Sequence, residues 1–125
     1  MTDQLTGVYI GKNGVVGTVT VDNDMKSFYK LLDVNCIQMP RRRIGDQIFR
    51  IVYDEEALIR RDPVVTAIDP MGYPMVFNSL FIISDDEKGG FKSLTKSQCQ
   101  KIMDYIRPCS EGDEVRMMLT NVSYR

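Results

Sequence analysis

The chain contains no histidine and no tryptophan, and only three of its 125 residues are cysteines. The missing histidine removes the commonest general base near neutral pH, the usual partner of a serine or cysteine nucleophile, and the commonest zinc ligand. An enzyme that uses Asp, Lys or Tyr stays open only as a minor alternative. We therefore expect a binding protein that is not an enzyme and that needs no cofactor.

Long apolar runs are also missing, and none approaches the roughly 20 residues that a membrane-spanning helix needs. The first six residues lack the basic and apolar regions of a signal peptide. Cys36, Cys99 and Cys109 are an odd number without CxxC spacing, which favours free thiols in a reducing compartment. These features predict a cytoplasmic protein with no membrane contact.

Charge is balanced, with 16 Lys and Arg against 17 Asp and Glu and a net charge of -1. This balance argues against non-specific binding to nucleic acid. The acidic runs at 54–56 and 85–87 lack the spacing of a calcium loop, so no metal site is expected. The length is that of one ordinary domain, which predicts a single compact domain over residues 1–125.

Hydrophobic periodicity and turn residues predict an α+β fold, with a mainly antiparallel sheet of five to seven strands and two helices. The expected strands cover residues 8–10, 15–21, 34–39, 48–53, 64–68, 75–83 and 115–124. The first two form a hairpin around Asn13-Gly14. The first expected helix runs from Met25 up to Asp33 and is capped by Asn23 or Asp24. The second is opened by a Thr95/Gln98 capping box, carries Ile106 on its apolar face and stops before Pro108.

The remaining segments are expected to be irregular. Residues 1–6 are predicted as a flexible start, 41–46 as a basic turn, 84–90 as a mobile acidic loop, and 108–114 as a linker to the closing strand. The closing strand is expected to pair with the amino-terminal hairpin or with another subunit.

Arginines supply the sharpest candidate site. Arg41, Arg42 and Arg43 are consecutive, and guanidinium groups at a turn suit bidentate recognition of phosphate. Arg60 and Arg61, together with Arg50, are expected near the same end of the sheet. The alternative for the triplet is a solvated basic turn.

Tyr73 and Asn78 offer a ring for stacking and an amide for edge hydrogen bonds, as a nucleobase pocket requires. The alternative is that Tyr73 covers the edge of the core while Asn78 caps a turn or bulge. The predicted ligand-binding set is Arg41, Arg42, Arg43, Arg60, Arg61, Tyr73 and Asn78.

Several short motifs resemble an uncharacterised family of small phage and mobile-element proteins, a domain of unknown function. They are Pro63-Val64-Val65-Thr66-Ala67, Gly72-Tyr73-Pro74, Phe77-Asn78-Ser79-Leu80 and Phe91-Lys92-Ser93-Leu94-Thr95. The resemblance spans residues 15–106 and leaves the closing strand outside. It implies a viral or prophage origin and transfers no catalytic residue.

By analogy with small phage proteins, the resemblance suggests a counter-defence protein in the host cytoplasm. The first expectation is sequestration of a small nucleotide immune signal, at a site shared by the subunits of a homo-oligomer. The alternative is a protein inhibitor that binds a host defence enzyme such as a CRISPR nuclease.

Overall fold

The structure is a computed structural model that describes residues 3–11, 14–59, 64–86, 88, 90–111 and 113–123. These residues form two sheets, two α-helices and one short 3-10 helix. The strands are β1 (Gln4–Ile10), β2 (Val16–Asp22), β3 (Ile37–Gln38), β4 (Arg41–Ile44), β5 (Gln47–Asp54), β6 (Val65–Ile68), β7 (Pro74–Phe77), β8 (Leu80–Asp85), β9 (Phe91–Lys92), β10 (Ile106–Glu111), β11 (Glu114–Leu119) and β12 (Val122–Ser123). The helices are α1 (Met25–Leu32), η1 (Ala57–Ile59) and α2 (Lys96–Met103).

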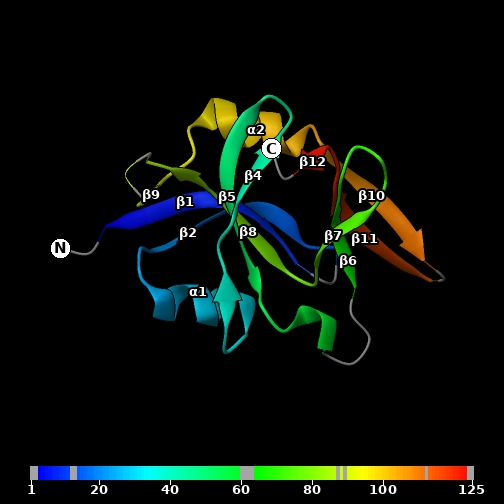
Figure 1. Cartoon of the computed structure of the whole chain (residues 1–125), viewed down its shortest axis with the longest axis horizontal. Helices are drawn as coiled ribbons and strands as arrows, with labels where there is room; N and C mark the ends of the chain where they lie inside the picture. Colours follow the sequence, from blue (N-terminus) through cyan, green and yellow to red (C-terminus); the bar gives the residue numbers. More distant parts are fainter. Residues whose placement is uncertain are drawn as a thin grey trace.

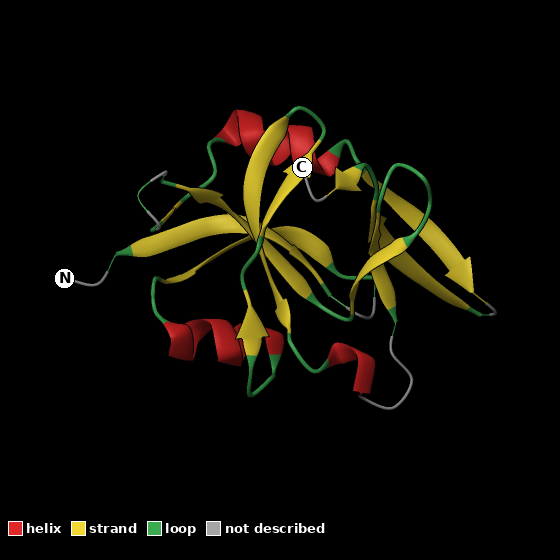
Figure 2. Ribbon diagram, in the orientation of Figure 1, coloured by secondary structure: helices red, strands yellow, loops and turns green. Residues whose placement is uncertain are grey.

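The larger sheet has the strand order β12-β4-β5-β8-β1-β2, with β3 added beside β5 and β9 beside β8. All of its pairs are antiparallel. Figures 1 and 2 show α1 and α2 on opposite faces of this sheet, with the smaller sheet to one side. The central strands are therefore covered on both faces, as their nearly continuous apolar sequence requires.

Side-chain alternation along the central strands divides the core into two clusters. On one face Phe49 and Ile51 of β5 pack in a cluster that includes Ile102 of α2. On the other face Val52 of β5 joins the cluster that holds Phe28 of α1. Because side chains of a strand alternate between its faces, one strand contributes to both clusters.

The amino-terminal hairpin confirms its prediction, because β1 and β2 pair in register from Gln4↔Asp22 to Ile10↔Val16. Its turn residues 12–13 lie outside the described part of the chain. Gly7 is needed where β1 meets β8, since a Cβ at this position would lie 2.2 Å from the carbonyl oxygen of Ile82. The close approach of the two strands therefore excludes any larger residue there.

Both helices begin where the sequence predicts. Asp24 caps α1, its carboxylate accepting a hydrogen bond from the backbone N–H of Ser27 at 2.7 Å. Thr95 and Gln98 form the predicted capping box of α2. α2 ends at Met103, not at residue 106, because the chain turns at 104–105 and Ile106 opens β10.

The smaller sheet has the order β10-β11-β6-β7, and it was not expected. β11 and β6 are joined by one parallel bridge, Leu119↔Ala67. Residues 108–114 were predicted as a linker, but 108–111 belong to β10 and Glu114 begins β11, while residue 112 lies outside the described part of the chain. The predicted pairing of the closing strand with the amino-terminal hairpin is wrong, since β11 pairs with β10 and β6, while β12 pairs with β4. Its pairing with another subunit stays a prediction.

The described residues contain twelve strands where five to seven were predicted, partly because one expected strand is two. Residues 75–83 divide into β7 and β8, which belong to different sheets. Asn78 separates them with φ 63°, a left-handed conformation that asparagine tolerates. A uniform apolar run cannot reveal this change of sheet.

Three further segments predicted as irregular are regular. Residues 41–44 form β4, and the turn that follows uses Gly45 at φ 63°. Gln4–Thr6, expected in the flexible start, are paired in β1. Ser84 and Asp85, expected in the acidic loop, complete β8.

Candidate functional site

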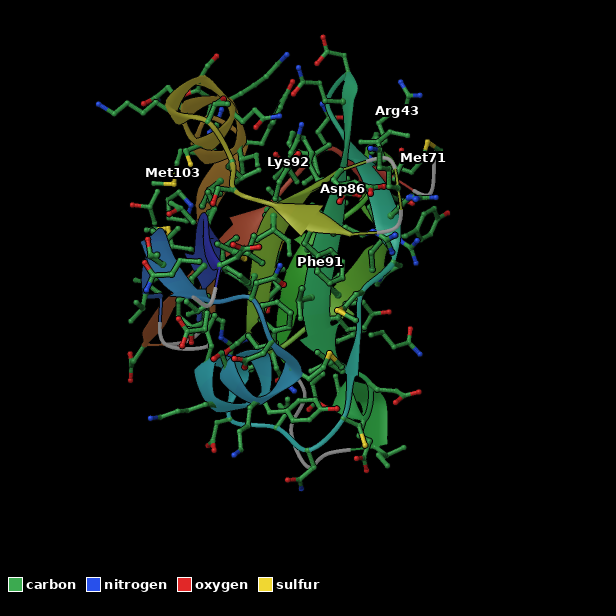
Figure 3. The ribbon with its side chains drawn as sticks, turned by 90° about the vertical axis from the view of Figure 1, so that its left-hand side faces the viewer. Arg43, Met71, Asp86, Phe91, Lys92 and Met103 are labelled. Atoms are coloured by element: carbon green, nitrogen blue, oxygen red, sulfur yellow. The ribbon has the colours of Figure 1, made fainter. Side chains whose placement is uncertain are left out.

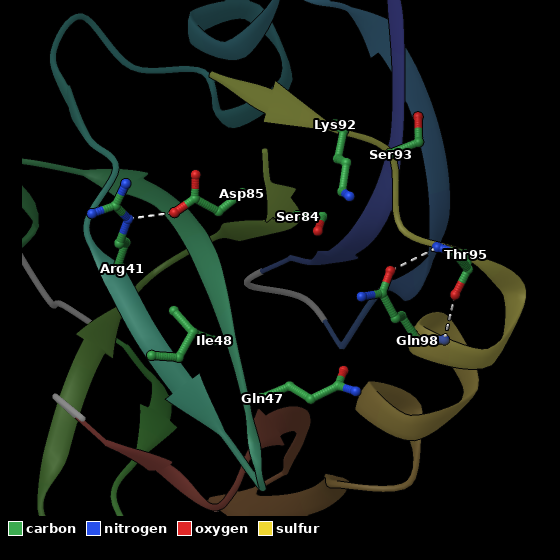
Figure 4. A pocket seen from close by; sticks show the side chains of 9 residues that line it. All are labelled: Arg41, Gln47, Ile48, Ser84, Asp85, Lys92, Ser93, Thr95 and Gln98. Carbon is green, nitrogen blue, oxygen red and sulfur yellow. Dashed lines mark hydrogen bonds and ion pairs between the residues drawn. The ribbon is translucent and has the colours of Figure 1, made fainter. Parts of the chain in front are cut away.

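An open groove of about 730 Å³ has the size of small-molecule sites. It lies between the β4–β5 hairpin, the end of β8, β9 and the start of α2 (Figure 4). Its side chains are mostly polar, with one aliphatic member. They are Arg41, Gln47, Ile48, Ser84, Asp85, Lys92, Ser93, Thr95 and Gln98.

An ion network forms one wall of the groove. Arg41 of β4 and Arg50 of β5 are directly opposite each other, a like-charge pair that alone destabilises two strands. Asp85 at the end of β8 offsets this repulsion. Its carboxylate pairs with Arg41, and its Oδ2 lies 3.8 Å from Nε of Arg50.

The three members of this network differ in exposure. The Asp85 and Arg50 side chains are 10% and 18% exposed, whereas that of Arg41 is 52% exposed. Arg50 also donates to the carbonyl of Met39 at 2.8 Å, and its guanidinium lies 5.6 Å from the ring centre of Phe91. Arg50 is therefore a structural cation, and Arg41 is the one that a ligand can reach.

β9 places one cation over the groove. Lys92 points into the cavity (Figure 4), while Phe91 packs against the cluster around α1. Figure 3 shows the two side chains leaving β9 on opposite sides. The strand pairs with β8 through Ser84↔Lys92, so Lys92 leaves the sheet on the face that carries Ser84, whereas Asp85 lies opposite Phe91 on the other face.

The start of α2 forms the opposite wall. Ser93 accepts a hydrogen bond from the backbone N–H of Thr6 at 2.8 Å, which anchors the segment before the helix to β1. Gln98 uses its Oε1 to accept from the N–H of Thr95 at 2.9 Å. Its amide nitrogen then faces the groove as a donor (Figure 4).

The groove can bind an anion, but it holds no activated nucleophile. Two cations and one carboxylate line it, and the other polar groups are amides and hydroxyls. The three cysteines do not line the groove, and the thiols of Cys36 and Cys99 are poorly activated. Partial burial raises the pKa of Cys99, and burial together with the neighbouring Glu56 raises that of Cys36.

Of the predicted ligand-binding residues, only Arg41 lines the groove. The alternation of β4 separates Arg42 from its neighbours, and Arg42 donates to the carbonyl of Arg41. Figure 3 places Arg43 beside the edge of the hairpin, away from Lys92. Arg60 and Arg61 lie outside the described residues.

Tyr73 and Asn78 do not line the groove. Tyr73 is 65% exposed, next to β7. Asn78 is buried, and its Oδ1 accepts from the N–H of Val64 at 3.1 Å. The described contacts of Asn78 are thus those of a residue that fixes the chain between the two sheets.

Sequence reasoning missed most of the groove. Gln47, Lys92 and Ser93 have no special spacing, and only their meeting in space makes them a site. Asp85 belonged to an acidic run that looked like a solvated loop. The one available signal was the Thr95/Gln98 capping box, which located the helix start but not its neighbours.

A family model described as "Domain of unknown function (DUF3846)" matches residues 5–107. The chain belongs to the DUF3846 family. The predicted resemblance to a family of unknown function is thereby confirmed, while a phage or mobile-element origin stays a prediction. The match includes every residue of the groove and ends before β11.

No curated protein and no solved structure matches the chain. In the part of the chain that the structure describes, no helix is both long and apolar enough to cross a membrane. The same residues contain no group of three or more Cys, Asp or Glu side chains placed to hold a metal ion.

Proposed function

We propose that this protein is a non-enzymatic binding protein whose groove holds a small anionic ligand of nucleotide size. The observation that supports the proposal is that Arg41 and Lys92, from different strands, both line a groove of about 730 Å³ whose other side chains are mostly polar. Two cations in one groove suit a phosphate or diphosphate group. Asp85 pairs with Arg41 and sets its orientation. The negative charge of Asp85 also disfavours non-specific binding of polyanions in the groove.

The other side chains fit the remaining parts of a nucleotide. Ile48 is 48% exposed and offers an aliphatic surface for one face of a base. Gln47 and Gln98 can donate and accept at base edges, as amides do in nucleobase recognition. The hydroxyls of Ser93 and Thr95 suit a sugar or a second phosphate.

The finer function follows the family resemblance. We propose that the ligand is a nucleotide immune signal and that the protein lowers its free concentration in the host cytoplasm by binding it. Retention without turnover is consistent with a chain that has no histidine. A groove that is open to solvent allows the ligand to enter without unfolding.

The test has two stages. Purified protein is first incubated with bacterial host extract, washed and heat-denatured, and the released small molecules are identified by mass spectrometry. Calorimetric titration with the recovered compound, or with a panel of cyclic and ADP-ribose-derived nucleotides, then follows. Lys92→Ala is expected to weaken binding by about tenfold, the loss of one charge-assisted hydrogen bond.

Lys26→Ala is the matched control, because this exposed lysine lies on α1, on the opposite face of the sheet. It should leave affinity unchanged. An empty protein that no nucleotide binds or thermally stabilises contradicts the proposal. Conversion of the nucleotide to a product contradicts its non-enzymatic part.

A second function is favoured by one surface feature. Met71 and Tyr73 are 79% and 65% exposed in the turn between β6 and β7, and adaptable methionine beside an aromatic ring is typical of protein contacts. We propose as the alternative that this turn binds a host defence enzyme. Recovery of a stoichiometric protein from lysate by the wild type, and its loss with Tyr73→Ala, would support this function over nucleotide binding.

A further inference from the structure

The outer edge of β2 carries a row of unpaired backbone groups. Asn23 donates to the carbonyl of Asp3 and Gly11 to that of Val15, at 2.8 and 2.7 Å. Because bonded and non-bonded pairs alternate along an antiparallel ladder, the odd-numbered residues of β2 face β1. The N–H and C=O of Val16, Thr18 and Thr20 therefore point outward, and no described residue bonds to them.

This edge lacks two of the devices by which proteins block strand addition, since β2 has no proline and no charge before Asp22 at its end. Residues 15–21 read Val-Val-Gly-Thr-Val-Thr-Val, without a charge or a proline. The other outer strands of the described sheets differ. β12 has two residues, β7 begins with Pro74, and β10 contains Arg107 and Pro108.

We propose that β2 pairs antiparallel with β2 of a second copy of this chain, joining the two larger sheets across a two-fold axis. The outward N–H and C=O groups of Val16, Thr18 and Thr20 are arranged symmetrically about Thr18. The donors of one copy can therefore bond to the acceptors of the other, and the reverse. Thr18 then lies opposite Thr18 of the second copy, and Val16 lies opposite Thr20. This register makes six hydrogen bonds and ends where the carbonyl of Asp22 is already taken by the N–H of Asp24.

A second observation selects the same register. Val15 is 57% exposed, unusual for a valine beside a strand. In this register Val15 of one copy lies opposite Val21 of the other, on the face that carries α1. A cavity of about 390 Å³ is found there, lined by Val21 and by Leu31 of α1 among others. The cavity also has polar lining residues, among them Asp22 and Lys30, and its apolar part, Val21 and Leu31, is what the exposed valine of the second copy would contact.

Self-pairing also agrees with the charges and with the groove. No charged side chain of residues 15–21 opposes its own copy, and a net charge of -1 gives little repulsion between subunits. β1 lies between β2 and the strand β8 that forms the groove. Both grooves stay open in the dimer, so this inference does not depend on the proposed ligand.

The experiment measures mass and backbone protection together. Sedimentation equilibrium of the full chain from micromolar to millimolar concentration should give twice 14.3 kDa. Hydrogen exchange followed by NMR should show concentration-dependent protection of the amides of Val16, Thr18 and Thr20. Thr18→Lys places two ammonium groups opposite each other and should raise the dissociation constant by about tenfold or more.

Ser97→Lys is the control for an added lysine, since Ser97 is an exposed hydroxyl residue on α2. Val15→Asp is the second variant, because it tests the apolar contact without changing the strand; Met71→Asp, at an exposed apolar position outside β2, is its control. Thermal melts check that each variant folds.

Two results would overturn the proposal. One is a protein that stays monomeric at every concentration. The same conclusion holds if the amides of Val16, Thr18 and Thr20 become protected only when a different protein is added. The other is a dimer that survives both Thr18→Lys and Val15→Asp with those amides unprotected. Dimerisation that is lost in both variants and kept in both controls supports the β2 interface.

Discussion

Replacing Asp85 with asparagine should lower the stability of the fold and raise the affinity of the groove for anions. The substitution keeps the size of the side chain but removes the negative charge that separates Arg41 from Arg50. Arg50 stays mostly buried, with its bond to the carbonyl of Met39. Arg41 loses its ion pair and becomes available to a ligand.

The stability cost can be worked from the contacts. Two charges near 4 Å interact by about 4 kcal/mol at an effective dielectric constant of 20, before desolvation and screening are subtracted. Arg41 is 52% exposed, so its pair is worth at most about 1 kcal/mol. The less exposed Arg50 adds about 1 kcal/mol, and the unmasked repulsion between the two strands adds about 0.5 kcal/mol. The expected loss is at most about 2.5 kcal/mol.

Urea unfolding of wild type and Asp85→Asn measures this loss as a shift in the midpoint at constant slope. Arg50→Met and the double variant complete a cycle, in which the coupling energy isolates the Arg50–Asp85 pair. Titration with inorganic pyrophosphate measures the groove. A variant that is as stable as the wild type, or one whose pyrophosphate affinity falls, refutes the assignment of Asp85 as the group that restrains Arg41.

Three further predictions concern the fold. Phe28→Ala should cost about 3 to 5 kcal/mol in guanidinium unfolding, because its buried ring contacts two other aromatic rings under α1. Asn78→Ala should cost about 2 to 3 kcal/mol and Asn78→Gly less, as measured by thermal melts, since both lose the Oδ1 bond but only alanine is strained at φ 63°. Hydrogen bonds from Ser27 hold the pKa of Asp24 below its ordinary value of 3.8. The ionised Asp24 cap therefore stabilises the fold above pH 3.8, and this stabilisation is lost as the pH falls through the pKa of Asp24 in the folded state. Asp24→Asn should therefore make the acid limb of the stability curve shallower while changing neutral stability little, and an unchanged limb would contradict this cap.

The sequence predicted those parts of the fold that depend on neighbouring residues. The β1–β2 hairpin, the Asp24 cap of α1 and the Thr95/Gln98 capping box each need only a few consecutive side chains and their backbone. Prediction from the sequence failed for strands whose pairing depends on contacts beyond their own neighbouring residues. Residues 41–43 looked like a basic turn because three arginines are strongly polar, yet pairing with β5 makes them a strand.

The candidate site shows the same division. Arg41 was predicted from its charge, but Lys92 and Asp85 are ordinary in sequence and matter only because β8, β9 and the β4–β5 hairpin meet. Arg42 does not line the groove because successive side chains of a strand point to opposite faces, and Arg43, on the same face as Arg41, lies farther along the hairpin toward its turn.

Composition and local pattern by themselves determined that the chain has no histidine chemistry, mixes helices with mainly antiparallel strands, and caps its helices at Asn23 or Asp24 and at Thr95. Only the tertiary structure decided that the strands form two sheets, that Arg41 and Lys92 line the same groove, and that the edge of β2 is open. The physical reason is how far apart along the chain the interacting residues lie. Caps and turns are fixed by hydrogen bonds a few residues apart, whereas strand partners and cavities depend on contacts between segments up to 89 residues apart, as between Ser93 and Gln4.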